Sequence, residues 1–110
     1  MESILTSIKK LLGIAEEYND FDVDLIIHIN SVLAVLYQIS PLFPKDFTIS
    51  DSFATWQDFL GDVSGVELVK TYVYLKVRMA FDPPTTGGVL DAMKQQINEL
   101  EWRLSVADNI

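Results

Sequence analysis

The sequence predicts a small all-α protein: a helical bundle of about four to five helices, with a long C-terminal helix and at most a short extended piece near residues 46–50. In several segments apolar residues recur every three or four positions, which is the period of an α-helix face. Glycines and prolines, which tend to end helices, stand between these segments. The 110 residues suffice for one hydrophobic core but not for two, so we expect a single domain over residues 1–110.

The first helix is predicted over about residues 2–12. Its apolar residues share one face: Ile4, Ile8, Leu11 and Leu12. Lys9 and Lys10 lie near the C-terminal end, where the helix dipole favours positive charge, and Gly13 suits the left-handed residue that follows a helix. A helix this short needs tertiary packing to be stable.

The second helix is predicted to begin near residues 20–22 and to end near residue 40, before Pro41. Asp20 or Asp22 is the expected N-cap. Its apolar stripe is wide enough to predict burial on two sides, and comprises Leu25, Ile26, Ile27, Ile29, Val32, Leu33, Val35, Leu36 and Ile39.

Residues 41–50 are predicted to form a loop, because two prolines interrupt them, with a short extended piece at its end. A short helix over residues 52–60 is expected next, capped by Asp51 or Ser52 and ended by Gly61. One side of this helix is lined by large apolar residues: Phe53, Trp56, Phe59 and Leu60.

The fourth helix is predicted over about residues 65–81, with Ser64 and Glu67 matching a capping box. Apolar residues surround almost the whole helix: Val66, Leu68, Val69, Tyr72, Val73, Tyr74, Leu75, Val77, Met79 and Ala80. Such a helix is either central or shared between the core and an interface.

The fifth helix is predicted over about residues 86–106. Apolar residues alternate at spacings of three and four, as along a coiled-coil seam: Leu90, Met93, Ile97, Leu100 and Leu104. Trp102 lies off this seam. The tail over residues 107–110 is expected to be flexible.

The connection into the last helix combines residues that favour a hinge. Two prolines stop the preceding helix, and a glycine pair follows, where glycine allows either bending or close packing. A glycine pair at a helix N-terminus can also hold an anion, but the lysine and the preceding strand of a phosphate-binding loop are missing. We therefore predict a hinge formed by Asp82, Pro83, Pro84, Gly87 and Gly88.

The composition excludes several classes of function. The chain has no cysteine, which excludes disulfides, thiolate nucleophiles and cysteine-based zinc sites. Its formal net charge is −8, and its eight basic residues are scattered, so we do not expect direct binding to duplex DNA. No run of about 18 uninterrupted apolar residues predicts a membrane span, and the N-terminal residues do not resemble a signal peptide.

The residues that could carry catalysis or bind metal do not form a convincing set. His28 is the only histidine, and its one acidic neighbour at helical spacing is Asp24. Counted from Asp22, the glycine and glutamate of a calcium loop are replaced by Ile27 and Leu33. We therefore predict a protein that is not an enzyme and that has no cofactor or metal.

The aromatic residues are better candidates for function. Most of them are expected in the core, but Trp102 and one of Trp56 and Phe59 are the preferred interface anchors, because tryptophan contributes disproportionately to binding energy.

Several segments also resemble a known family. They are IKKLLGI (residues 8–14), DVDLIIHINSV (22–32), WQDFL (56–60), VKTYVYLKVRM (69–79), FDPP (81–84) and LEWRL (100–104). Together they cover nearly the whole chain in order, and they resemble the head–tail connector (adaptor) proteins of long-tailed phages and prophages of Gram-positive hosts. The most specific combination is FDPP followed by ELEWRL. The loop SPLFPKDF departs from the glycine-rich turn of that family.

The resemblance implies a subunit of the virion that assembles in the host cytoplasm into a ring, typically of twelve copies, at the head–tail interface. Such a ring lies beneath the portal protein, extends the DNA channel without binding DNA specifically, and docks the next neck or tail protein. The C-terminal helix would dock against the portal, and the segment from Trp56 to Phe59 would face a neighbouring subunit. The residues expected at these interfaces are Trp56, Phe59, Tyr74, Glu101, Trp102 and Arg103.

The residues themselves are compatible with assembly, because the last two helices offer more apolar surface than one small bundle easily hides. The acidic chain would suit a conduit that must not retain DNA, although acidity also serves solubility alone. The alternative from another class is a stand-alone helical interaction module or regulator that forms a homodimer through the seam of the last helix.

Overall fold

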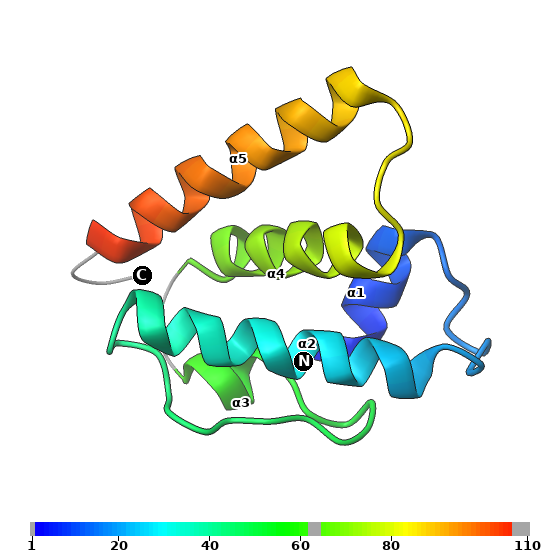
Figure 1. Cartoon of the computed structure of the whole chain (residues 1–110). Helices are drawn as coiled ribbons and strands as arrows, with labels where there is room; N and C mark the ends of the chain where they lie inside the picture. Colours follow the sequence, from blue (N-terminus) through cyan, green and yellow to red (C-terminus); the bar gives the residue numbers. More distant parts are fainter. Residues whose placement is uncertain (1, 62–64, 107–110) are drawn as a thin grey trace.

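The computed structural model describes residues 2–61 and 65–106, and this part of the chain is all-α, as predicted (Figure 1). No β-strand occurs among the described residues. The helices are α1 (Ile4–Leu12), α2 (Asp22–Ile39), α3 (Trp56–Leu60), α4 (Val66–Phe81) and α5 (Gly87–Val106). The tail over residues 107–110, expected to be flexible, lies outside the described residues.

Helix α4 lies at the centre of the bundle, with α2 on one side and α5 on the other (Figure 1). Helix α1 packs against both α4 and α2, and α3 lies beneath α2 in the same view. The buried residues of α4 point to several neighbours at once: Val69, Tyr72, Val73, Leu75 and Val77. Of the two positions predicted for this helix, central or shared with an interface, the structure shows the central one.

Helix α1 is capped at both ends by its own sequence. The Ser3 hydroxyl accepts a hydrogen bond of 3.2 Å from the Thr6 amide, and this satisfies one free N–H of the first turn. At the other end Gly13 adopts the left-handed conformation, with φ of 81°, and its amide donates to the Lys10 carbonyl over 3.1 Å. The predicted stop at Gly13 is confirmed.

The predicted N-cap of α2 is wrong. Phe21, rather than either aspartate, precedes the helix, and no side chain caps it. Asp22 is the first helical residue, and its carboxylate lies 2.9 Å from the ammonium of Lys9. Lys9 is only 2% exposed, so the side chain that could have capped α2 neutralises a buried charge on α1 instead.

Helix α3 begins four residues later than predicted. Thr55 is its N-cap: the Thr55 hydroxyl accepts from the Asp58 amide over 3.1 Å, and Asp58 accepts from the Thr55 amide over 2.9 Å. Asp51, one of the predicted caps, accepts a hydrogen bond of 2.9 Å from the Phe53 amide and so forms a turn before the helix. Phe53 was predicted to line the apolar side of this helix. That prediction is wrong, because Phe53 precedes α3 and is 83% exposed.

Helix α4 begins after Gly65, which has φ of 91°, and no side chain caps it. Ser64, the predicted capping residue, lies outside the described residues. Glu67 instead shares the ammonium of Lys70 with Glu2, at N–O distances of 3.3 Å and 2.9 Å. This contact joins α4 to the residues that precede α1.

The predicted loop over residues 41–50 is held to α2 by Asn30. The Asn30 side chain donates to the Ile49 carbonyl over 3.0 Å and accepts from the Ile49 amide over 2.8 Å. One side-chain amide thus satisfies both backbone groups that a neighbouring strand would satisfy in a sheet. This explains how Ile49 is ordered here without a strand partner.

Helix α2 is long and apolar enough, by length and composition alone, to cross a membrane. Its mean hydropathy is high although His28, Asn30 and Ser31 interrupt the apolar residues. The core helix of a folded domain passes the same test, and one face of α2 is in the core: Leu25, Ile29, Val32, Leu33 and Leu36.

Candidate interaction surfaces

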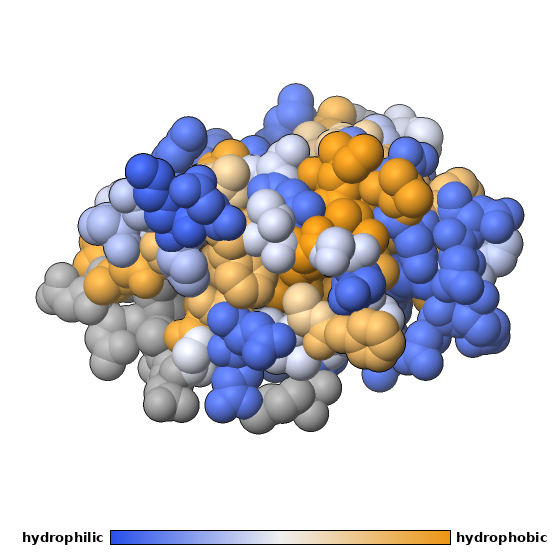
Figure 2. Space-filling model, turned by 90° about the horizontal axis from the view of Figure 1, so that it is seen from below, coloured by the Kyte–Doolittle hydropathy of each residue, from blue (hydrophilic) through white to orange (hydrophobic). Residues whose placement is uncertain are grey.

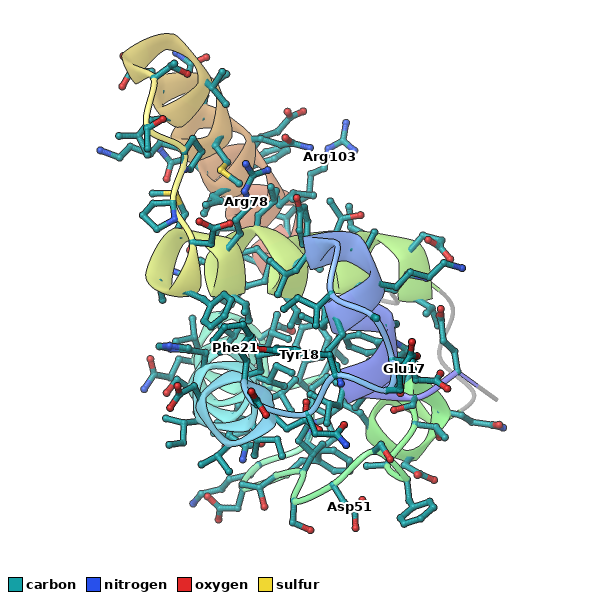
Figure 3. The ribbon with its side chains drawn as sticks, turned by 90° about the vertical axis from the view of Figure 1, so that its right-hand side faces the viewer. Glu17, Tyr18, Phe21, Asp51, Arg78 and Arg103 are labelled. Atoms are coloured by element: carbon teal, nitrogen blue, oxygen red, sulfur yellow. The ribbon has the colours of Figure 1, made fainter. Side chains whose placement is uncertain are left out.

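The outward side of α5 carries exposed residues near its C-terminal end. Trp102 is 66% exposed and Val106 is 55% exposed. The guanidinium of Arg103 lies 3.3 Å from the carboxylate of Glu99, one turn earlier, and Figure 3 shows Arg103 projecting away from the bundle. The opposite side of α5 is buried through Met93, Ile97, Leu100 and Leu104. The helix is therefore anchored on one side and available on the other.

Glu101 is held inside the subunit rather than at this outward surface. Its carboxylate accepts a hydrogen bond of 2.8 Å from the hydroxyl of Tyr72, which is fully buried on α4. Burial first, and this hydrogen bond second, raise the pKa of Tyr72 above its ordinary value, so the phenol stays protonated. Glu101 thus ties α5 to α4 and helps to set the orientation of the outward residues.

Tyr74 lies on α4, beside a recess that α4 and α5 form together. Its hydroxyl accepts a hydrogen bond of 3.1 Å from the guanidinium of Arg78, one turn later on α4. Figure 3 shows Arg78 on the side of α4 that faces α5. A recess of about 300 Å³ is lined there by Tyr74, Leu75, Arg78, Val89, Ala92, Met93 and Gln96.

Trp56 and Phe59 lie in the core. Each is 2% exposed. The indole N–H of Trp56 donates to the Ser7 hydroxyl over 2.8 Å, and the Phe59 ring stacks on Phe43 at a centroid distance of 5.9 Å. In this conformation neither ring offers surface to a neighbouring subunit.

The predicted hinge lies between α4 and α5. The amide of Asp82 donates to the Arg78 carbonyl over 2.8 Å and so closes the last turn of α4. Gly87 and Gly88 are the first residues of α5, and a Cβ atom on either would meet no atom within 4 Å beyond its chain neighbours and its own helix backbone. Close packing therefore does not explain the glycine pair, and the hinge stays a prediction.

A groove between α2, α4 and α5 was not predicted. It has a volume of about 580 Å³. Its lining residues are His28, Ser31, Val32, Val35, Lys76, Met79, Ala80, Lys94, Ile97 and Asn98. These residues come from three helices, so no pattern within one helix could have shown them together.

Apolar residues are also exposed away from α5. Figure 2 shows hydrophobic residues gathered among hydrophilic ones on the face seen from below, the side on which α2 and α3 lie in Figure 1. On α2, Val23 is 71% exposed and Ile27 is 58% exposed. Within residues 66–81, by contrast, no large hydrophobic residue is exposed. The expectation of surplus apolar surface on both of the last two helices thus holds for α5 only.

The comparison with protein-family models gives a single result for nearly the whole chain. The model described as phage connector protein matches residues 4–109. The chain belongs to the phage connector protein family. No curated protein and no solved structure matches it. Membership assigns a structural role in phage, in agreement with the resemblance seen in the sequence.

The fold of this connector also bears on the alternative of a homodimer formed through the last helix. The seam on which that alternative depends is inside the subunit, since Met93, Ile97, Leu100 and Leu104 are each at most 7% exposed. A dimer through this seam would require α5 to leave α4. The surface that α5 leaves free is the opposite one.

Phage connectors are a structural class of protein. A metal site requires several convergent ligands. Among the described residues of this connector, no group of three or more histidine, aspartate or glutamate side chains is placed to hold a metal ion. His28, the only histidine, lies 6.4 Å from the ring of Phe81, measured between ring centroids, and lines the groove.

Proposed function

We propose that this connector is a head–tail connector subunit that forms a ring under the portal, extends the DNA channel and docks the next neck or tail protein. The observation that carries the proposal is the two-sided character of α5. Its inner side is fixed to α4, while Trp102 remains 66% exposed on its outer side. An exposed tryptophan on a long, rigid helix is suited to anchor a partner protein.

Within this proposal, Trp102 and Arg103 contact the portal directly. Glu101 and Tyr74 act from within the subunit, because Glu101 is hydrogen-bonded to Tyr72 and Tyr74 to Arg78. Trp56 and Phe59 support the ring by keeping the core intact rather than by touching a neighbour, since both are buried.

The test is the affinity of purified protein for the portal protein encoded by the same phage. Trp102→Ala should weaken binding by about 2–4 kcal/mol, which is the usual cost of truncating a desolvated tryptophan anchor. Its stability to urea should stay within about 0.5 kcal/mol of wild type, because the side chain is mainly solvated in the free subunit. Gln95→Ala, another exposed position of α5, is the matched control and should leave binding unchanged.

Equal portal affinity of wild type and Trp102→Ala would refute the docking role of α5. The ring itself is tested by mass measurement of the protein with and without the portal, and the portal should shift the protein from small species towards ring-sized complexes. The net charge of −8 supports a channel that releases DNA, so a filter-binding assay at physiological salt should retain no DNA.

A further inference from the structure

The groove between α2, α4 and α5 is electrostatically unusual for this chain. The chain has 16 acidic and 8 basic residues, yet no acidic residue lines the groove. Its polar margin includes Lys76 and Lys94, and neither forms an ion pair with any carboxylate that the structure describes. Its apolar residues include Val35, Met79 and Ile97. A groove of this kind favours an apolar group that carries a negative charge beside it.

The same chain presents such a group elsewhere. Phe53 is 83% exposed, a high value for so large an apolar side chain, and Asp51 beside it is also exposed. The hydrogen bond of 2.9 Å from the Phe53 amide to the Asp51 carboxylate fixes the turn that carries both residues. The aromatic ring and the carboxylate are therefore carried by one ordered turn, so less backbone conformational entropy is lost on binding than in a flexible loop.

The turn and the groove cannot meet within one subunit. The groove is formed by α2, α4 and α5, whereas the turn precedes α3 and lines a different recess, with residues of α1. Figure 3 shows Asp51 at the edge of the molecule, on the side of α2 away from α4 and α5. A contact between two different surfaces of identical chains is heterologous, and repetition of such a contact generates a ring when it closes.

We infer that the groove receives the Phe53 turn of a second copy of this chain, with Asp51 placed near Lys76 and Lys94. The inference rests on the proposed function, since it names the contact between neighbouring subunits of the ring. Charge complementarity favours a second copy: the groove is basic in an acidic chain, and the turn that fits it is acidic and aromatic. The outer side of α5 then remains free to bind the portal.

Cysteine cross-linking tests the contact directly, because the chain has no cysteine of its own. In the double variant Ser31→Cys and Ser52→Cys, one thiol lies at the groove and the other beside Phe53, and both positions are exposed. A short bifunctional maleimide should then produce a ladder of dimers, trimers and higher species. The matched control is Ser31→Cys with Ser105→Cys, which moves the second thiol to the exposed end of α5.

The yield of cross-linked species should exceed that of the control by about tenfold or more. Adding Phe53→Ser should reduce this yield to the control level. Lys76→Glu with Lys94→Glu should also reduce it, and Asp51→Lys in that background should restore it. Since these side chains lie outside the core, their substitution leaves the fold intact, and circular dichroism verifies this. A yield equal to the control, or dimers without higher species, would overturn the inference.

The same cross-linking is carried out on purified protein and on phage particles made with the variant gene. Absence of the protein from particles would refute the proposed function while a ladder in purified protein would still support the contact. Presence in particles, without a ladder in either sample, would leave the function standing and refute the contact. Cross-linking of the groove thiol to another virion protein would identify a different occupant. It would overturn the inference that a second copy of this chain binds the groove.

Discussion

Lys9 is the residue whose environment differs most from what its type suggests. It is 2% exposed, and its ammonium lies 2.9 Å from both the Asp22 carboxylate and the Glu16 carbonyl. The Asp22 oxygen that faces the lysine makes no hydrogen bond of good geometry, so the pair is held mainly by charge. Removal of either partner would leave the other partly buried and uncompensated.

Lys9→Ala is therefore expected to destabilise the protein by about 3 kcal/mol, the lower end of the range for a broken buried pair. The lower end applies because a quarter of the Asp22 side chain is exposed. Urea unfolding measures the effect. Lys10→Ala, at the exposed neighbouring position, is the control and should change stability by less than about 0.5 kcal/mol. Equal effects of the two substitutions would show that the pair contributes little.

At the residue scale, the sequence could not separate the roles of the two tryptophans. Both stand at helical positions among apolar neighbours, but Trp56 is 2% exposed and Trp102 66%. Trp56 is held in the core by the bond from its indole to Ser7, 49 positions away along the chain, and by the bond from its amide to the Glu2 carbonyl. The exposure of Trp102 agrees with its position off the apolar seam of its helix, which is visible from spacing alone, and its role as an interface anchor stays a prediction.

At the element scale, the attachment of α5 to α4 depends on a polar contact in an apolar setting. Tyr72→Phe removes the hydrogen bond to Glu101 and should cost about 1.5 kcal/mol at neutral pH. The pKa of Tyr72 is raised in the folded state, so its contribution is fully present below the ordinary tyrosine pKa of about 10 and is lost as pH rises above it.

Urea unfolding between pH 7 and pH 11 tests this linkage. Wild type should lose more stability than Tyr72→Phe above about pH 10, because only the wild-type unfolded chain can ionise this phenol. The other tyrosines are present in both proteins, so the difference isolates Tyr72. Parallel pH profiles for the two proteins would contradict the raised pKa.

The helices could be predicted because their boundaries are set by local signals. Gly13, Pro41 and the prolines after Phe81 each stop a helix, and α1, α2 and α4 end within two residues before them. The predicted N-cap of α2 and the predicted start of α3 were wrong for two different reasons. Asp22 pairs with Lys9 on α1 instead of capping α2, and that contact lies outside any local pattern. The start of α3 is set by the capping box of Thr55 and Asp58, a local signal that the prediction did not use, and the Trp56 amide also donates to the Glu2 carbonyl there.

At the scale of the whole molecule, apolar surface is distributed around the subunit rather than concentrated on one helix. Val23 and Ile27 on α2, Phe53 before α3 and Trp102 on α5 are all more than half exposed. The molecule is a flat body of 35 × 35 × 20 Å, and these residues belong to three different segments of it. Separate apolar surfaces suit a subunit with several neighbours better than a protein with one binding face.

A hinge before α5 would let this body adjust to two neighbours at once, and the glycine pair provides the test. Gly87→Ala with Gly88→Ala meets no steric obstacle, since neither Cβ would contact an atom within 4 Å beyond its chain neighbours and its own helix backbone. Each substitution should stabilise the free subunit by about 0.5–1 kcal/mol, because alanine restricts the unfolded chain and favours the helix. If α5 must bend relative to α4 on docking, the same variant should bind the portal more weakly despite its greater stability. Thermal unfolding and portal affinity measured on one preparation separate the two effects, and a gain in both would show that the connection between α4 and α5 is a passive linker.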